Sequence, residues 1–139
     1  MSGLRIVCIG GGPAGLYFAL LMKKQNPAND ITVYERNQPD STFGWGVVFS
    51  DETLQNFEAD PESKAEIDAA LAHWDDIDVH FKGKCVTSSG HGFSGIGRMK
   101  LLQILQERCR ALGVKLEFGA EIDTAEAYAD ADIVIAADG

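Results

Sequence analysis

The chain has 139 residues, of which 45% are hydrophobic and 24% are charged, and its formal net charge is −9. This length and composition predict one compact globular domain, and the acidic balance argues against nucleic acid as a partner. No apolar run is long enough to span a membrane, and no basic segment precedes the first apolar run. We therefore expect no signal peptide and a cytoplasmic location. Cys8, Cys85 and Cys109 form neither a CxxC pair nor a Cys/His cluster, so we expect small apolar residues in the interior.

Residues 1–36 predict a strand, a helix and a second strand. The apolar run from Leu4 to Ile9 is typical of a strand that is buried on both faces. Pro13 suits the first turn of a helix, and Asn26-Pro27 is a signal that stops it. A second strand-like run from Ile31 to Tyr34 follows and leads into Glu35.

The rest of the chain alternates between glycine-rich stretches and periodic segments. We expect an extended loop over 37–50, a short helix over 51–57 and a helix that begins at Asp60-Pro61 and runs through Leu71. Alternation over 77–81 predicts a half-exposed strand, which Gly83 turns into a second strand around 85–87. Residues 98–112 predict an amphipathic helix that ends at Gly113, and 114–118 and 132–136 predict two more strands. No linker interrupts the chain, so we expect residues 1–139 to form one domain without an internal boundary.

The segment Gly10-Gly11-Gly12-Pro13-Ala14-Gly15 satisfies the pattern G-x-G-x-x-G between a predicted strand and a predicted helix. Gly10 permits the tight turn out of the strand. Gly12 has no side chain, so that a pyrophosphate can approach the backbone, and Gly15 lets the helix pack close to the sheet. The helix start, including Pro13 and Ala14, presents backbone N–H groups and a positive dipole end to phosphates. The pattern therefore predicts a dinucleotide site.

Glu35 stands 20 positions after Gly15, at the end of the second predicted strand. Its carboxylate can accept hydrogen bonds from ribose hydroxyls and would repel a 2′-phosphate, which favours FAD or NAD over NADP. The turn, followed by Tyr-Glu-Arg, resembles the FAD site of glutathione-reductase-type flavoproteins, and this resemblance places Arg36 beside the adenine. The other interpretation of Arg36 is a solvated surface charge. The expected fold class is α/β, a Rossmann-like βαβ domain with a helical and β insertion, incomplete at its C-terminus.

Three further segments resemble group A FAD-dependent aromatic monooxygenases. Residues 43–54 resemble a loop of the aromatic-CoA enzymes, such as anthraniloyl-CoA monooxygenase and salicylyl-CoA 5-hydroxylase, and the shorter Gly-Trp-Gly-Val-Val is similar to the violacein-pathway hydroxylase. The resemblance implies that Gly46 and Val47 face the isoalloxazine ring. Gly97-Arg98 resembles a helix start at which Arg98 reaches the FAD phosphates or ribityl chain, where a guanidinium suits phosphate. Asp138-Gly139 resembles a motif for FAD and reduced nicotinamide, with Ala136 where glycine is usual.

The resemblance implies a monooxygenase in which NADH or NADPH reduces FAD and one oxygen atom is transferred to an aromatic ring. The loop at 43–54 implies an aromatic acid carried as a CoA thioester. Because the cofactor carries the chemistry, we expect no catalytic side chain, and His73, His80 and His91 are spaced neither as metal ligands nor as a triad with a serine. The alternatives are an FAD- or NAD-linked reductase or dehydrogenase, and an inactive FAD-binding fragment. We expect the fragment to self-associate, because the last predicted strand would leave an open apolar edge.

Overall fold

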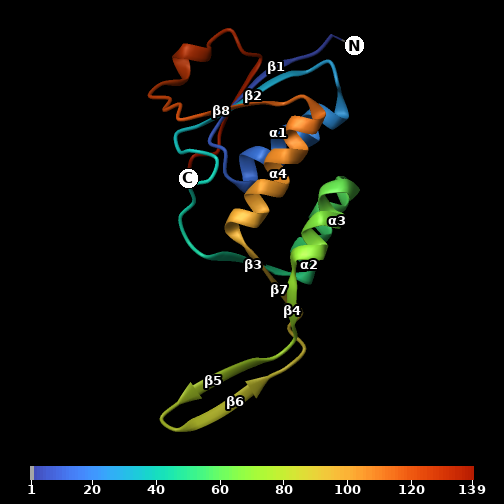
Figure 1. The fold of residues 1–139 in the computed structure, drawn as a ribbon, viewed down its shortest axis with the longest axis vertical. Helices are drawn as coiled ribbons and strands as arrows, with labels where there is room; N and C mark the ends of the chain where they lie inside the picture. The colour runs from blue at the N-terminus through green and yellow to red at the C-terminus, as the bar shows by residue number, and fades with distance from the viewer. Residues whose placement is uncertain (1) are drawn as a thin grey trace. The chain divides into compact units, whose positions relative to one another are not determined.

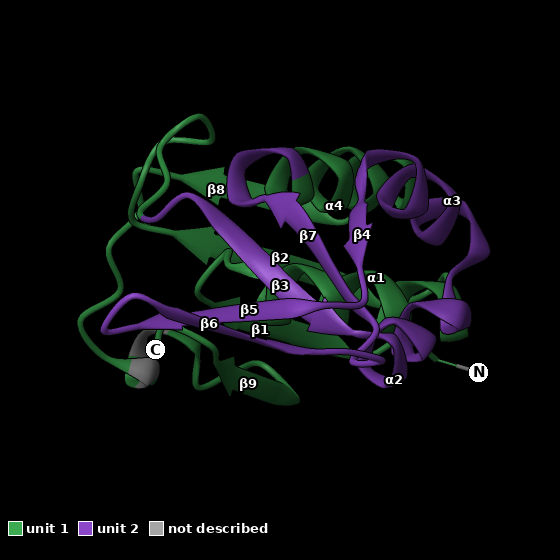
Figure 2. Ribbon diagram, turned by 90° about the horizontal axis from the view of Figure 1, so that it is seen from below, with its two compact units in different colours: residues 1–43, 101–139 green, residues 44–100 purple. Residues whose placement is uncertain are grey.

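The chain forms two compact units in the computed structural model, which describes residues 2–139 apart from the side chains of residues 125 and 127. One unit holds the residues up to Phe43 together with Leu101–Gly139, and the other holds Gly44–Lys100 (Figure 2). We refer to them as unit 1 and unit 2. The expectation of one domain without an internal boundary stays a prediction.

Unit 1 contains a four-stranded sheet in which every pairing is parallel. Its strands are β1 (Arg5–Ile9), β2 (Asp30–Glu35), β8 (Lys115–Phe118) and β9 (Ile133–Ala136), in the order β8-β2-β1-β9 (Figure 2). The chain therefore places β2 and β8 on one side of β1 and then returns to place β9 on the other side. This order is that of a Rossmann-like fold, and it confirms the predicted α/β class.

Two helices accompany this sheet. The helix α1 (Pro13–Gln25) begins at the predicted proline, and α4 (Arg98–Leu112), whose first residues belong to unit 2, ends before Gly113 at φ 86°. A 3₁₀ turn, η2 (Ala125–Tyr128), precedes β9. The thiol of Cys109 on α4 donates a hydrogen bond to the carbonyl of Leu16 on α1 at 3.3 Å. The core of unit 1 consists of fully buried side chains from β1, β2, α1 and α4: Ile6, Val7, Cys8, Leu16, Leu20, Ile31, Val33, Leu101, Ile104 and Leu105.

Unit 2 contains two antiparallel sheets and the helices between their strands. The first sheet has the order β3-β7-β4, with β3 (Gly46–Ser50), β7 (Phe93–Gly97) and β4 (Ala72–Trp74). The second is the hairpin of β5 (Ile77–Phe81) and β6 (Lys84–Ser88). Between β3 and β4 lie α2 (Asp51–Leu54), the 3₁₀ helix η1 (Gln55–Ala59) and α3 (Pro61–Ala70). In the part of the chain that the structure describes, no helix has the length and apolar character that crossing a membrane requires.

The structure of unit 2 differs from the sequence predictions in four elements. The expected loop over 37–50 contains β3, and neither β4 nor β7, which lies in a segment with four glycines over 90–97, was expected. Strands β3 and β7 pair over a long separation in sequence, with Gly46 opposite Gly97, so their stability comes from the pairing rather than from a local pattern. The predicted helix over 51–57 is shorter, because it continues as the 3₁₀ helix η1 after Leu54.

The predicted hairpin around Gly83 is present, but it is more exposed than the alternation indicated. Every residue of β5 and β6 is exposed, and the hairpin extends away from the rest of unit 2 (Figure 1). Cys85 is therefore exposed, which corrects the expectation of three buried cysteines; only Cys8 and Cys109 are buried. The burial expected for the apolar face of β5 does not occur, because none of the described residues covers it.

Candidate functional site

The glycine-rich turn lies at the carboxyl end of β1, between the ends of β2 and β9. The backbone N–H of Gly10 donates to the carbonyl of Tyr34 at 2.8 Å, and the N–H of Ala137 donates to the carbonyl of Ile9 at 2.7 Å. The strand order reverses here, because the chain builds outward to β8 before it returns to β9. In open parallel sheets, ligands bind outside the carboxyl ends of the strands at such a switch point.

The three motif glycines of this turn are in three different environments. Gly10 has a φ of 109°, and a Cβ there would lie 2.3 Å from the carbonyl oxygen of Ala137. A Cβ on Gly15 would lie 2.1 Å from the carbonyl oxygen of Gly10, so α1 packs against the turn too closely for any side chain. At Gly12 no other part of the described chain lies within 4 Å of a Cβ. The turn therefore has no room for a side chain at Gly10 or Gly15, whereas the space beside the backbone of Gly12 is open.

Gly12 is also the N-cap of α1, and it provides no side-chain acceptor for the N–H groups of the first turn. These N–H groups have no partner within the helix, and they carry the positive end of the helix dipole. An open backbone surface at such a helix start has the shape and polarity that a phosphate group requires.

The carboxylate of Glu35 is held against the turn by three hydrogen bonds. Its Oε2 accepts from the backbone N–H of Gly11 at 2.8 Å, and its Oε1 accepts from the backbone N–H and from the side-chain amide of Asn37, both at 2.9 Å. Sequence reasoning missed Gly11 and Asn37. The extra glycine of Gly-Gly-Gly was the available signal for Gly11, because a Cβ there would lie 2.9 Å from the Cβ of Glu35.

Eight of the predicted site residues lie in unit 1: in the turn, at the start of α1, at or just after the end of β2, or after β9. Arg36 and Asp138 have exposed side chains, and Glu35 is half-buried. Because the carboxyl ends of parallel strands meet at one edge of the sheet, the structure brings these residues to the same edge. The eight are Gly10, Gly12, Pro13, Ala14, Gly15, Glu35, Arg36 and Asp138.

The other three predicted site residues, Gly46, Val47 and Arg98, lie in unit 2. The backbone N–H of Arg98 donates to the carbonyl of Trp45 at 3.2 Å, and Gly46 pairs with Gly97. A Cβ on Gly46 would lie 3.0 Å from the carbonyl oxygen of Ile96, which leaves little room for a side chain. The three residues therefore share one end of the β3–β7 pair, next to a tryptophan whose side chain is 100% exposed.

The thiol nearest the glycine-rich turn is unsuited to nucleophilic chemistry. Cys8 is fully buried within β1, and this burial raises the pKa of its thiol to about 11. It therefore remains protonated at neutral pH, whereas the thiolate is the reactive form.

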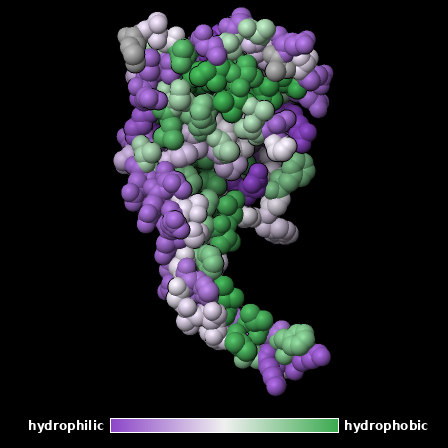
Figure 3. Space-filling view, turned by 180° about the vertical axis from the view of Figure 1, so that it is seen from behind, coloured by the Kyte–Doolittle hydropathy of each residue, from purple (hydrophilic) through white to green (hydrophobic). Residues whose placement is uncertain are grey.

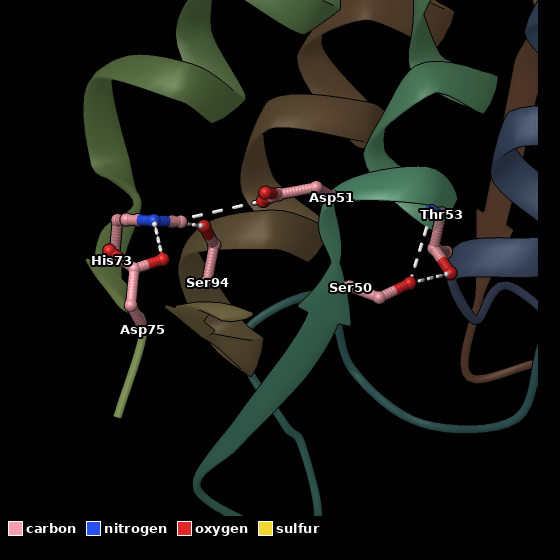
Figure 4. A network of polar contacts seen from close by, with 6 residues as sticks. All are labelled: Ser50, Asp51, Thr53, His73, Asp75 and Ser94. Atoms are coloured by element: carbon pink, nitrogen blue, oxygen red, sulfur yellow. Dashed lines mark hydrogen bonds and ion pairs between the residues drawn. The ribbon is translucent and has the colours of Figure 1, made fainter. Parts of the chain in front are cut away.

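Unit 2 also contains a histidine that contacts both a serine and an aspartate, an arrangement that the sequence spacing did not indicate (Figure 4). His73 Nδ1 lies 3.0 Å from the hydroxyl of Ser94, and Nε2 lies 3.1 Å from Asp75 Oδ1. Asp51, at the start of α2, lies 3.8 Å from Nδ1. Ser94 is only 2% exposed, so a substrate cannot reach its hydroxyl. We interpret the group as a polar network that joins β4, β7 and α2.

Comparison with known proteins gives one family and several relatives. Residues 5–139 match the family described as Lycopene cyclase protein. A salicyloyl-CoA 5-hydroxylase from Streptomyces sp is 43% identical over 98% of this chain and 26% of that protein. A 3-hydroxy-4-methyl-anthranilyl-[aryl-carrier protein] 5-monooxygenase from Streptosporangium sibiricum is 34% identical, over 98% of this chain and 38% of its own length. A protodeoxyviolaceinate monooxygenase from Chromobacterium violaceum is 32% identical, with the same coverage.

These relatives confirm the resemblance to aromatic-CoA and violacein-pathway enzymes that the loop and helix motifs indicated. The tetrameric form of 2-methyl-3-hydroxypyridine-5-carboxylic acid oxygenase superposes with a TM-score of 0.76 at 22% identity, over 87% of this chain and 33% of that one. This likeness supports the fold. The chain spans 26% to 38% of the length of the three sequence relatives.

Proposed function

The chain belongs to the lycopene cyclase protein family, which matches residues 5–139, and we propose that it is the FAD-binding portion of a flavin-dependent monooxygenase. The observation that supports FAD binding is the glycine-rich turn at the switch point of the sheet. This turn leaves open space beside Gly12 and has no room for a side chain at Gly10 and Gly15. The reaction is taken from the three relatives, which are named hydroxylases or monooxygenases, and not from the name of the family.

The turn fits the pyrophosphate of a dinucleotide. Gly12 leaves the backbone accessible, and Pro13, Ala14 and Gly15 start the helix whose N–H groups and dipole stabilise negative charge. Glu35 would accept hydrogen bonds from the ribose hydroxyls. Its Oε1 already accepts two hydrogen bonds from Asn37, whereas its Oε2 accepts only one, from Gly11, so Oε2 has a second lone pair for a ligand.

The charge of Glu35 selects against a 2′-phosphate, which distinguishes FAD and NAD from NADP at this position. Arg36 is exposed just after β2, where its guanidinium would lie beside the adenine. In unit 1 we also propose Asp138 as a contact of the cofactor, and in unit 2 we propose Gly46, Val47 and Arg98 as candidate contacts, each unit being considered by itself. Within unit 2, the small residues at the end of β3 would let a flat ring approach the backbone, and Arg98 would neutralise a phosphate.

When bound, FAD would supply the redox chemistry that transfers one atom of oxygen to an aromatic ring, with NADH or NADPH as the reductant. The residues of this chain bind and orient that cofactor; none of them is required as a nucleophile or a general base. Two of the relatives act on aromatic acyl groups carried on CoA or on an aryl-carrier protein. We therefore propose an aromatic acid, activated as such an acyl group, as the substrate class.

The binding experiment is a titration of the chain with FAD and with NAD, followed by flavin fluorescence and calorimetry. We expect FAD to bind and NAD to bind weakly or not at all. Gly12→Val should abolish FAD binding while leaving the fold intact, because no described atom lies within 4 Å of the added Cβ. Glu35→Ala should weaken FAD binding. The control is Glu117→Ala, which removes an exposed carboxylate on β8 and should leave FAD binding unchanged. Circular dichroism checks the fold of each variant.

Two results would overturn the proposal: NAD binding without FAD binding, and FAD binding that is unchanged in Gly12→Val. A reductase or dehydrogenase is the second candidate, because the same turn and acidic residue also serve NAD enzymes. An assay of the complete enzyme separates the two, since only a monooxygenase yields hydroxylated product in an oxygen-dependent reaction. We expect the 139-residue chain alone to bind FAD and to form no hydroxylated product, because it spans at most 38% of the relatives.

A further inference from the structure

The β5–β6 hairpin carries a row of polar side chains on one face. The two-residue turn, Lys82-Gly83, has a positive φ at both positions, 48° and 77°, as a tight hairpin of this kind requires. This turn sets the register, in which Asp78 faces Thr87 and His80 faces Cys85. Since side chains alternate between the faces of a strand, these four residues share one face.

Three of these side chains bring metal-binding atoms together. One ligand atom from each of Asp78, His80 and Cys85 lies within 4.8 Å of the other two. The sulfur of Cys85 lies 3.7 Å from Nε2 of His80. In a tetrahedral zinc site, bonds of about 2.0 to 2.3 Å separate neighbouring ligand atoms by about 3.6 Å. The Cys85–His80 pair already has this spacing, and a carboxylate oxygen of Asp78 lies within 4.8 Å of both atoms.

The chemistry of the three groups indicates the metal. A thiolate, an imidazole and a carboxylate are the ligands of zinc, whereas Ca²⁺ and Mg²⁺ prefer oxygen alone. The hydroxyl of Thr87 donates to Asp78 Oδ1 at 2.6 Å and so orients the carboxylate, the role that an outer-shell residue has in metal sites. Each of the three ligand residues is exposed, so an ion can reach them from solvent.

A zinc ion would also resolve a physical weakness of this hairpin. Its apolar face leaves Val79 56%, Phe81 67% and Val86 66% exposed, and the projecting segment in Figure 3 accordingly shows hydrophobic as well as hydrophilic residues. A two-stranded hairpin without a packed face is marginally stable in water. A metal held by β5 and β6 together would join the two strands and add its binding free energy to their pairing.

We propose that Asp78, His80 and Cys85 bind one Zn²⁺ ion, with a water molecule in the fourth position and Thr87 as the residue that orients Asp78. These residues are not part of the glycine-rich turn, and the experiments that test zinc binding do not depend on whether the chain binds FAD. Zinc binding releases the thiol proton to the buffer, and no redox step is involved. Asp78, His80 and Cys85 have the spacing Asp-x-His-x₄-Cys along the chain, and the pairing of β5 with β6 brings them together.

The test uses the full 139-residue chain, freed of metal and kept reduced with a phosphine that does not bind metal. Co²⁺ is added as a spectroscopic probe, because a thiolate bound to Co²⁺ gives a charge-transfer band that carboxylates and imidazoles do not give. Zn²⁺ affinity is then measured by displacement of Co²⁺. We expect one Co²⁺ per chain, a thiolate band, and complete displacement by Zn²⁺.

Matched variants separate the cluster from other metal-binding groups. Cys85→Ser should remove the charge-transfer band, and His80→Gln and Asp78→Asn should each lower Zn²⁺ affinity by about 100-fold or more. His91→Gln and Asp76→Asn replace exposed residues of the same types outside the cluster and should change affinity less than twofold. Thr87→Val should lower affinity by about tenfold, as the loss of an outer-shell hydrogen bond does. All of these residues are exposed, so the fold should survive each change.

A second measurement reports on the hairpin itself. Amide hydrogen exchange of β5 and β6 should slow on addition of Zn²⁺ in the native chain and not in Cys85→Ser, because binding stabilises only the state that holds the ion. The proposal is overturned if the thiolate band is absent, if the band persists in Cys85→Ser, or if exchange in the hairpin does not respond to Zn²⁺. Loss of FAD binding in the glycine variants, or its absence altogether, would leave these results unchanged.

Discussion

A single methyl group added at Gly15 should destabilise the chain, although alanine forms helices better than glycine. An ideal Cβ at this position lies 2.1 Å from the carbonyl oxygen of Gly10 and 3.4 Å from the Cβ of Ala137. The first contact is with backbone, which cannot move aside as a flexible side chain would. Overpacking of this kind costs about 1 to 3 kcal/mol, whereas the helix preference returns only about 0.5 to 1 kcal/mol. We expect Gly15→Ala to lower the free energy of unfolding by about 1 to 2 kcal/mol.

Urea unfolding followed by circular dichroism measures this change as a lower midpoint at an unchanged slope. The neighbouring substitution Ala14→Gly isolates the helix preference, because Ala14 is exposed in the same turn of α1. It should cost about 0.5 to 1 kcal/mol. If there were free space beside Gly15, Gly15→Ala would raise the free energy of unfolding and Ala14→Gly would lower it. Because of the close contact at Gly15, we expect both substitutions to lower it. A Gly15→Ala chain that unfolds at or above the native midpoint would refute the close packing of α1 against the turn.

Three further predictions concern other parts of the chain. Asp60 is fully buried and caps α3 by accepting a hydrogen bond from the Ser63 N–H at 3.1 Å. Asp60→Ala should therefore lower the free energy of unfolding in urea by about 1 to 2 kcal/mol, and an unchanged urea midpoint would contradict the role of this cap. The hydrogen bond from Lys115 lowers the pKa of Asp30, so the stability that this pair contributes is present above the ordinary aspartate pKa and is lost as the pH falls through the lowered value. Because both side chains are more than half exposed, the stability difference between the native chain and Lys115→Met should stay below about 1 kcal/mol at neutral pH and vanish in acid. Strand β9 is an edge of the unit 1 sheet, and we expect the isolated chain to self-associate through it; a monodisperse monomer in light scattering would argue against that.

The sequence correctly predicted the helices and strands whose bounds depend on residues that are close together in the chain. The βαβ unit was predictable because Pro13 starts a helix, Asn26 ends it, and a buried strand precedes the glycines. The helix from Arg98 to Leu112 was predicted with its observed bounds, since its apolar stripe and Gly113 are both local features. The hairpin followed from alternation on either side of Gly83, because a two-residue turn sets its own register.

Non-local pairings were decided by the tertiary structure alone. Strand β3 begins at Gly46 and β7 contains Gly95 and Gly97, and the two strands pair with each other although they lie more than 40 residues apart. The parallel order of the sheet placed Glu35, the turn and the end of β9 at one edge, which no single motif states. The polar network of His73 depends on β4, which no pattern predicted.

The sequence by itself thus determined the chemistry available at the glycine-rich turn, because glycine geometry and helix starts are local properties of the backbone. It did not determine which side chains meet across strands. Asp78, His80 and Cys85 look unrelated along the chain, and they lie within reach of one ion only after two strands have paired. Cross-strand distance is set by register and twist, so a site built across strands becomes visible only in three dimensions.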